Sequence, residues 1–195
     1  MFKGLVVVFI VFSSCISHAE DSFLWKTVAG WEIRVDSTLG NGCYTTQIYD
    51  GDIFFRVGID KLDGGMYVMI GDQDWKSLEE GKNYPIKIYF GNASPWVGDA
   101  SALSFYEFPS LILRIGYSDS ANAAEFFEEF MTKTFVEIEY NDKSLAKLSL
   151  EGTYKAGLEM MVCQQSVDKM FNSPDPFANP GDSSTDSDDP FATSF

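Results

Sequence analysis

Short stretches in which apolar and polar residues alternate, separated by frequent turn residues, constrain the fold of this 195-residue chain most strongly. Residues 84–90, 136–140 and 146–150 each place an apolar side chain at every second position. A period of two puts those side chains on one face of a β-strand. Asp50-Gly51, which lies between two further apolar runs, is a two-residue hairpin signal. The pattern predicts an antiparallel sheet with one buried face.

Two segments in the C-terminal half have a helical period instead. Residues 121–132 follow Ser118-Asp119-Ser120, which suits a helix N-terminus, and they carry a stripe of three phenylalanines and a methionine. A second helix is expected to start near Thr153. Its apolar stripe, at the spacing of an amphipathic helix, consists of Tyr154, Gly157, Leu158, Met161 and Val162. We therefore predict an α+β fold, an antiparallel β-sheet or small β-sandwich of about seven to nine short strands with two amphipathic helices in the C-terminal half.

The N-terminus has the order of regions that is typical of a secretory signal. Lys3 supplies one positive charge, an apolar run follows over residues 4–12, and Ser17 and Ala19 are small residues that suit a signal peptidase. The run is shorter than the roughly 20 residues of a bilayer span. We expect residues 1–19 to be a cleaved signal peptide and the protein to be periplasmic or secreted, with no transmembrane span after cleavage.

Two alternatives remain open for this segment. One is a buried strand or helix at the start of the fold. The other is a lipid anchor at Cys15, because Ser13-Ser14-Cys15 weakly resembles the end of a bacterial lipobox. The mass of the mature N-terminus distinguishes these routes.

Signal cleavage changes the inventory of reactive side chains. The chain has three cysteines and one histidine, and loss of residues 1–19 removes Cys15 and His18. An even pair, Cys43 and Cys163, then remains in an oxidising compartment, which predicts a disulfide across 120 positions. Closing such a loop stabilises the fold by about 4–5 kcal/mol in the chain-entropy model. Two buried free thiols are the alternative.

The composition divides the rest of the chain into two parts. Residues 20–171 contain the predicted strands and helices and form a β-rich globular domain. Residues 172–195 contain four Pro, five Asp and five Ser but no Lys, Arg, Leu, Ile or Val. Such a segment buries too little apolar area to offset its ordering entropy, so we expect a disordered acidic tail.

Four aromatic residues are candidates for contact with a partner. Phe177 and Phe191 occupy the same place in a repeated Asp-Pro-Phe-Ala tetrapeptide of the tail, where low-complexity drift is the alternative. Trp75 and Trp96 follow turn residues, where an aromatic side chain is often half exposed and can anchor a protein or a glycan. Packing at the edge of the core is the alternative for both tryptophans.

The residue inventory excludes several kinds of chemistry. Without a histidine in the mature chain, Ser-His-Asp and Cys-His sites lack their base, and zinc sites lack their usual ligands. Neither a phosphate-binding loop nor a dinucleotide-binding glycine motif is present. Asp72-Gln73-Asp74-Trp75 lacks the glycine and glutamate of an EF-hand and predicts a polar turn. The net charge of −15 argues against a nucleic-acid partner. We expect no catalytic residue, metal or cofactor.

Carboxylate chemistry is the enzymatic alternative, because the chain holds 29 acidic residues. A glycan hydrolase needs two carboxyl groups about 5–10 Å apart in a cleft, one of them with a raised pKa. Glu137 and Glu139 share one face of a predicted strand, but Lys147 opposite them indicates a solvated, charged face instead.

The order of these features resembles the invasion-associated locus B family of small secreted alphaproteobacterial proteins. The resemblance begins at Trp31 and the Cys43 hairpin and continues through the Phe126/Phe127/Phe130 helix and the strand at 135–140. It ends in Leu148-Ser149-Leu150-Glu151-Gly152 and in a helix that carries Ala156, Leu158 and Cys163. The resemblance implies a periplasmic or secreted β-rich protein that aids host interaction.

These observations together predict an exported, non-enzymatic binding or interaction protein that is associated with a host or with the cell envelope. Its partner is an unknown protein or glycan of the envelope. The alternatives are a carboxylate-dependent envelope glycan hydrolase and an interaction protein that acts through its Asp-Pro-Phe tail.

Overall fold

A computed structural model describes residues 22–105, 108–116 and 120–171. The predicted signal peptide (1–19), the alternative lipid anchor at Cys15 and the predicted acidic tail (172–195) lie outside the described residues. The same holds for the two tail candidates, Phe177 and Phe191.

The described residues form one ten-stranded antiparallel sheet and two α-helices, so the predicted α+β class is confirmed. The strands are β1 (Ser22–Val28), β2 (Trp31–Asp36), β3 (Gly42–Tyr49), β4 (Ile53–Ile59), β5 (Met66–Gly71), β6 (Asn83–Phe90), β7 (Trp96–Phe105), β8 (Phe108–Ile115), β9 (Phe135–Tyr140) and β10 (Lys143–Ser149). The strand number is slightly above the predicted seven to nine, because β1 and β7 lack a clear alternation of apolar residues in the sequence.

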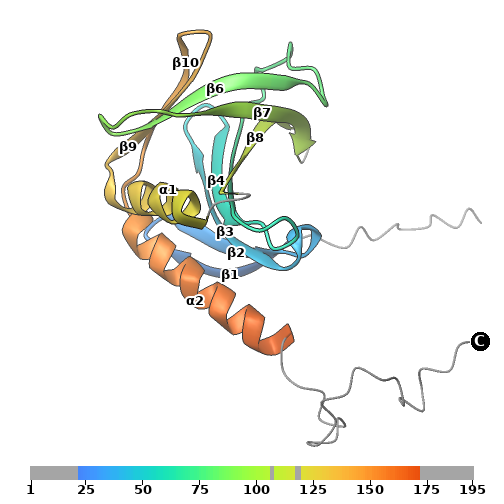
Figure 1. Ribbon diagram of the computed structural model, residues 1–195, viewed down its shortest axis with the longest axis vertical. Coiled ribbons are helices and arrows are strands. Elements are labelled where there is room, and N and C mark those ends of the chain that lie inside the picture. Colours follow the sequence, from blue (N-terminus) through green and yellow to red (C-terminus); the bar gives the residue numbers. More distant parts are fainter. Residues whose placement is uncertain (1–21, 106–107, 117–119, 172–195) are drawn as a thin grey trace, which may run out of the picture.

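The strand order is β1-β2-β3-β4-β5-β8-β7-β6-β9-β10. The first five strands follow one another as a meander, and β6, β7 and β8 then run back so that β8 pairs with β5. Figure 1 shows the sheet curling over, with β6 and β7 opposite β1 and β2 and with α1 (Ser120–Thr132) between them. The inner face of the curled sheet therefore encloses the main core.

Aromatic side chains of α1 connect the two sides of the curled sheet. The ring of Phe126 lies 5.0 Å from that of Phe90 on β6. One turn later, the ring of Phe130 lies 5.6 Å from that of Trp31 on β2 and 6.4 Å from that of Phe55 on β4. All five are buried, and such edge and tilted ring pairs stabilise a core beyond their apolar area. The helix thus acts as the central packing element of the fold.

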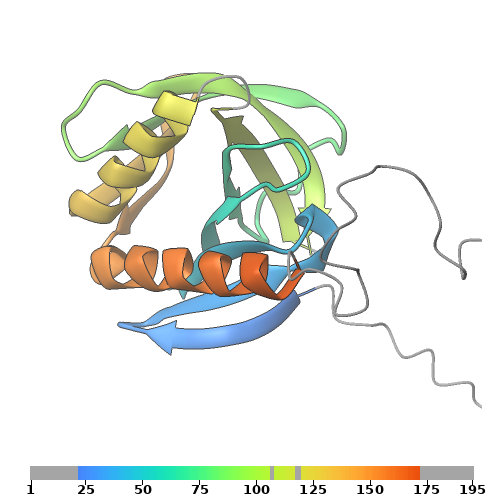
Figure 2. The same ribbon diagram turned by 60° about the horizontal axis from the view of Figure 1, so that its bottom comes forward.

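The second helix, α2 (Thr153–Phe171), packs mainly on β2 and β3 and also touches β1, on the same side of the sheet (Figure 2). Its buried residues are Thr153, Ala156, Gly157, Met160, Cys163, Gln164 and Val167. The stripe predicted from the sequence was therefore wrong except at Gly157, because Tyr154, Leu158, Met161 and Val162 are exposed.

Small residues and the disulfide explain why α2 buries a different face from the predicted one. A Cβ atom on Gly157 would lie 2.6 Å from Met131 Sδ on α1, so the helices approach closely only where glycine stands. Cys163 and Cys43 form a disulfide with 6.2 Å between their Cα atoms, which fixes the same helix face on β3. This is the pairing that the cysteine count predicted.

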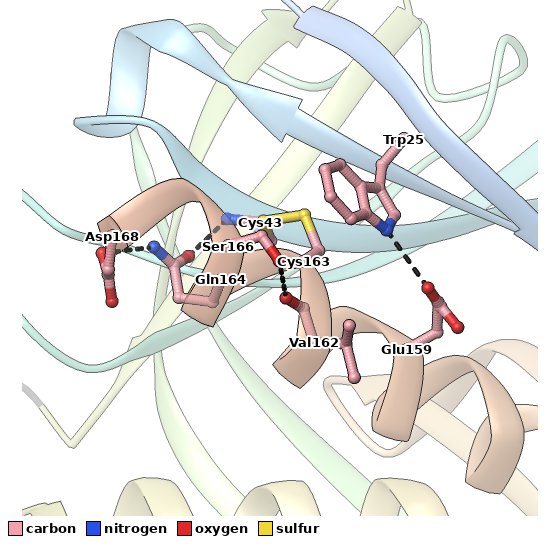
Figure 3. Close-up of a disulfide and its surroundings, with 8 residues drawn as sticks. All are labelled: Trp25, Cys43, Glu159, Val162, Cys163, Gln164, Ser166 and Asp168. Carbon is pink, nitrogen blue, oxygen red and sulfur yellow. Dashed lines mark hydrogen bonds between the residues drawn. A yellow bond between two sulfur atoms is a disulfide. The ribbon is translucent and has the colours of Figure 1, made fainter. Parts of the chain in front are cut away.

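Polar contacts flank the disulfide, as Figure 3 shows. The Gln164 side-chain oxygen accepts a hydrogen bond from the Cys43 backbone N–H at 2.7 Å, and the Gln164 amide donates to Asp168 at 2.9 Å. The indole N–H of Trp25 donates to Glu159 at 3.2 Å. Within the described ranges, neither helix is long and apolar enough to cross a membrane.

Candidate ligand-binding site

The structure gives the two candidate tryptophans different surroundings. Trp96 packs its ring 5.4 Å from that of Phe126 and donates its indole N–H to Glu129 at 2.6 Å, so it joins β7 to α1. Trp75 is half-buried and lines a shallow hollow of about 290 Å³ together with Tyr84 and Tyr140. Both tryptophans therefore pack at the edge of the core, and Trp75 also faces a space that a ligand can enter.

A second hollow lies on the outer face of the sheet and was not expected from the sequence. It has a volume of about 480 Å³. Its lining comes from β1, β2, β3, β4 and the β7–β8 hairpin, and includes Arg34, Tyr44, Ile48, Phe54, Arg56, Phe105 and Phe108. Pockets of this size that combine aromatic walls with a few polar groups are typical small-molecule sites.

The strand register explains why these side chains meet. Arg34 on β2 pairs with Tyr44 on β3, and Tyr44 pairs in turn with Gly58 on β4. Because side chains alternate between faces, Tyr44 and Arg56 both point to the outer face. A Cβ atom on Gly58 would lie 2.5 Å from the Tyr67 hydroxyl oxygen and 2.6 Å from Tyr44 Cβ. The glycine therefore makes room for both tyrosines beside Arg56.

Arg56 is the central residue of the outer hollow. Its side chain is 1% exposed, and its guanidinium carbon lies 3.4 Å from the centre of the Tyr44 ring. The rings of Tyr67 and Phe105 are each 5.1 Å from the same carbon. A cation over aromatic faces is stabilised by their quadrupoles, the more so when it is removed from water.

Two of the three guanidinium nitrogens of Arg56 have protein partners. Nε donates to the Tyr67 hydroxyl oxygen at 2.6 Å, and Nη2 donates to the Asp36 carboxylate. Nη1 has no hydrogen-bond partner among the described residues. Because Arg56 lines the hollow, this nitrogen has donor capacity left for a bound molecule.

The pKa values of Arg56 and Tyr67 are both raised. Burial lowers the pKa of Arg56, but its interactions with Tyr67, Tyr44 and the Asp36 carboxylate outweigh this effect, so the net pKa is raised and the guanidinium stays charged. Burial raises the pKa of Tyr67, which keeps its phenol neutral. The Asp36 carboxylate also accepts hydrogen bonds from the backbone N–H and the hydroxyl of Thr38, at 2.9 and 2.5 Å.

A second cation stands at the rim of the outer hollow. Arg34 pairs with Glu32 at 3.1 Å, and its Nε donates to the Ser22 hydroxyl at 3.3 Å. The side chain of Arg34 is 22% exposed and that of Glu32 is 48% exposed. Water therefore screens the glutamate charge more strongly than the arginine charge.

One signal in the sequence pointed to this site. Arg56 is the only charged residue in the run from Ile53 to Ile59. This run forms β4, which is mostly buried and lies between β3 and β5 in the interior of the sheet. A buried cation needs partners, so such a residue marks a built polar cluster. The partners themselves come from β2, β3, β5 and β7, and their convergence depends on topology that a single sequence does not reveal.

Other chemistry receives little support from the described residues. They contain no group of three or more His, Cys, Asp or Glu residues that could hold a metal ion. Hydrogen bonds from lysines lower the pKa values of Glu137, Asp142 and Glu159. A general acid of a glycan hydrolase needs the opposite shift, so these three carboxylates act as ion-pair partners.

Comparisons of the chain with protein-family models, with curated proteins and with solved structures found no match. The resemblance to the invasion-associated locus B family therefore stays a prediction.

Proposed function

We propose that this chain is an exported, non-enzymatic binding protein of the cell envelope or the host interface, and that its ligand site is the outer hollow around Arg56. The buried guanidinium that lines the hollow carries the proposal. The guanidinium packs against three aromatic rings, and its Nη1 has no partner among the described residues, so a ligand or water can complete its hydrogen bonds.

Two further observations support export. The Cys43–Cys163 disulfide suits an oxidising compartment, and the first 19 residues have the order of a signal peptide. The mature N-terminus, measured by intact mass, tests the export step separately from ligand binding.

The ligand site is tested with two matched surface variants. Ile48 lies on the rim of the hollow, whereas Val97 lies at the opposite end of β7 from Phe105. Both side chains are 69% exposed. The mature protein and its Ile48→Glu and Val97→Glu variants are each incubated with a small-molecule extract of the cell envelope. Retained molecules are then released and identified by mass spectrometry.

The proposal predicts that the wild type and Val97→Glu retain the same molecules and that Ile48→Glu loses them. Equal retention by all three proteins would place binding outside the outer hollow. The absence of any retained molecule from all three would contradict a small-molecule binding function.

A glycan bound at Trp75 is the second candidate, and one observation favours it. The indole N–H groups of Trp25, Trp31 and Trp96 all donate hydrogen bonds, whereas that of Trp75 has no partner among the described residues. Trp75 also shares its hollow with Tyr84 and Tyr140, whose rings meet edge to face at 5.6 Å. Retention of envelope glycan fragments that is lost in Trp75→Ala and kept in Ile48→Glu would establish this candidate instead.

A further inference from the structure

We propose that the ligand of the outer hollow is an apolar monocarboxylate, with its carboxylate at Arg56 and its apolar part against Phe105, Phe108 and Ile48. The inference rests on the proposed binding function and names the chemical class of the ligand. It follows from three properties of the hollow, namely its charge, its donor and its walls.

The charged residues that line the hollow favour an anion. Arg34 and Arg56 contribute two positive charges and Glu32 contributes one negative charge. Asp36 neutralises Arg56 from behind and is not part of the lining. The lining itself therefore carries one net positive charge in a protein whose net charge is −15, and Asp36 behind Arg56 brings the sum over the two ion pairs to zero.

The available donor favours a carboxylate over a neutral oxygen. Nη1 belongs to a guanidinium that is almost fully removed from water, where electrostatic interactions are strong. A charge-assisted hydrogen bond from guanidinium to carboxylate is roughly twice as strong as one between neutral groups. An ammonium group would meet two like charges instead.

The walls favour an apolar body of moderate size. Phe54, Phe105 and Phe108 pack together with ring distances of 5.5 and 5.7 Å and form one side of the hollow. The Ile48 side chain is exposed at the rim, so its apolar area does not stabilise the unbound protein. A bound alkyl chain or ring would cover this side chain and bury apolar area on both partners.

The test uses three probes with the same alkyl chain: octanoate, octan-1-ol and octylammonium. Each is titrated into the mature protein and into its Ile48→Glu, Arg34→Gln and Val97→Glu variants, and affinity is measured by calorimetry. Circular dichroism and thermal melting confirm that each variant is folded.

We expect octanoate to bind the wild type at least about tenfold more tightly than octan-1-ol, and octylammonium to bind more weakly than either. Arg34→Gln should weaken octanoate several-fold and leave octan-1-ol unchanged. Ile48→Glu should abolish octanoate binding, and Val97→Glu should not affect it.

Other results overturn the inference in distinguishable ways. Equal binding of octanoate and octan-1-ol, both lost in Ile48→Glu, would reject the carboxylate and leave the proposed function standing. The absence of binding by all three probes, with envelope molecules still retained in an Ile48-dependent manner, would reject only the ligand class. Octanoate binding that Ile48→Glu leaves unchanged would reject the hollow as the site and with it the proposed function.

Discussion

At the residue scale, Arg56 shows how one buried charge organises a face of the sheet. Its guanidinium is held by the Asp36 carboxylate, the Tyr67 hydroxyl and the ring of Tyr44, which come from three different strands. A buried ion pair is weak evidence for stability by itself, because desolvation of both charges offsets their attraction. Loss of one member of the pair is strongly destabilising, since the other charge then stays buried without a partner.

Replacement of Arg56 by methionine keeps much of the side-chain volume and removes the charge. We expect Arg56→Met to lower the free energy of unfolding by about 3–5 kcal/mol, because Asp36 would remain buried without its cation. Lys87→Met is the matched control, since Lys87 pairs with Asp142 at the surface, where water screens the charges and the pair contributes little to stability. Urea unfolding measures both, and equal losses would contradict the special role of the buried pair.

Glu159 gives the fold a contribution that depends on pH. A hydrogen bond from Lys26 at 2.8 Å, helped by one from the Trp25 indole, lowers its pKa. A carboxylate whose folded pKa is depressed stabilises the protein above its unfolded pKa, and this contribution is lost as the pH falls through the folded value. When the pH is lowered from neutral to about 3, the melting temperature of Glu159→Gln should therefore fall less than that of the wild type.

The control for this prediction is Glu125→Gln, which alters an exposed carboxylate on α1. Its acid-induced loss of melting temperature should match that of the wild type. Parallel curves for the wild type and Glu159→Gln would show that the contact with Lys26 has no thermodynamic weight.

At the element scale, the orientation of α2 is the clearest difference between sequence pattern and structure. Amphipathic spacing assigned the wrong face except at Gly157, because Ala156 is too small to register as an apolar anchor, yet Ala156 is buried and Gly157 allows the close approach to α1. The β-alternation and the hairpin signal were more informative, since the runs recognised in the sequence coincide with β3, β4, β6, β9 and β10. Two of the other strands lack a clear alternation for physical reasons: β1 lies at the sheet edge with little burial, and β7 consists largely of small residues.

The disulfide is expected to be the strongest single constraint on α2. Cys43→Ala/Cys163→Ala removes a link across 120 positions and should lower the free energy of unfolding by about 4–5 kcal/mol. Urea unfolding of the double variant, and of the wild type with and without reductant, measures this. A loss below about 1 kcal/mol would mean that α2 is held by packing alone.

At the scale of the whole molecule, the curled sheet separates two kinds of environment. Its inner face holds the core with α1 and α2, and its outer face holds a smaller aromatic cluster with the hollow around Arg56. The sequence predicted the inner face, because alternating apolar residues are visible along the chain. It did not predict the outer site, because that site combines residues from at least five strands that only the topology brings together.

Removal of residues 172–195 tests whether binding belongs to the folded domain. The described lining of the outer hollow extends only from Ser22 to Phe108, so a chain that ends at Phe171 should retain the same envelope molecules as the full mature chain. Mass spectrometry of the retained molecules measures this. Retention that disappears with these residues would instead support the Asp-Pro-Phe segment as the interacting element.

The position of a bound ligand tests the central claim most directly. An amide NMR spectrum of ¹⁵N-labelled mature protein is recorded during titration with octanoate. We predict the largest shift changes at the amides of Tyr44, Thr46 and Ile48 and at the Nε–H of Arg56, because these residues line the outer hollow. Changes that gather instead around Trp75, Leu78 and Leu145 would place the ligand in the other hollow and contradict the account.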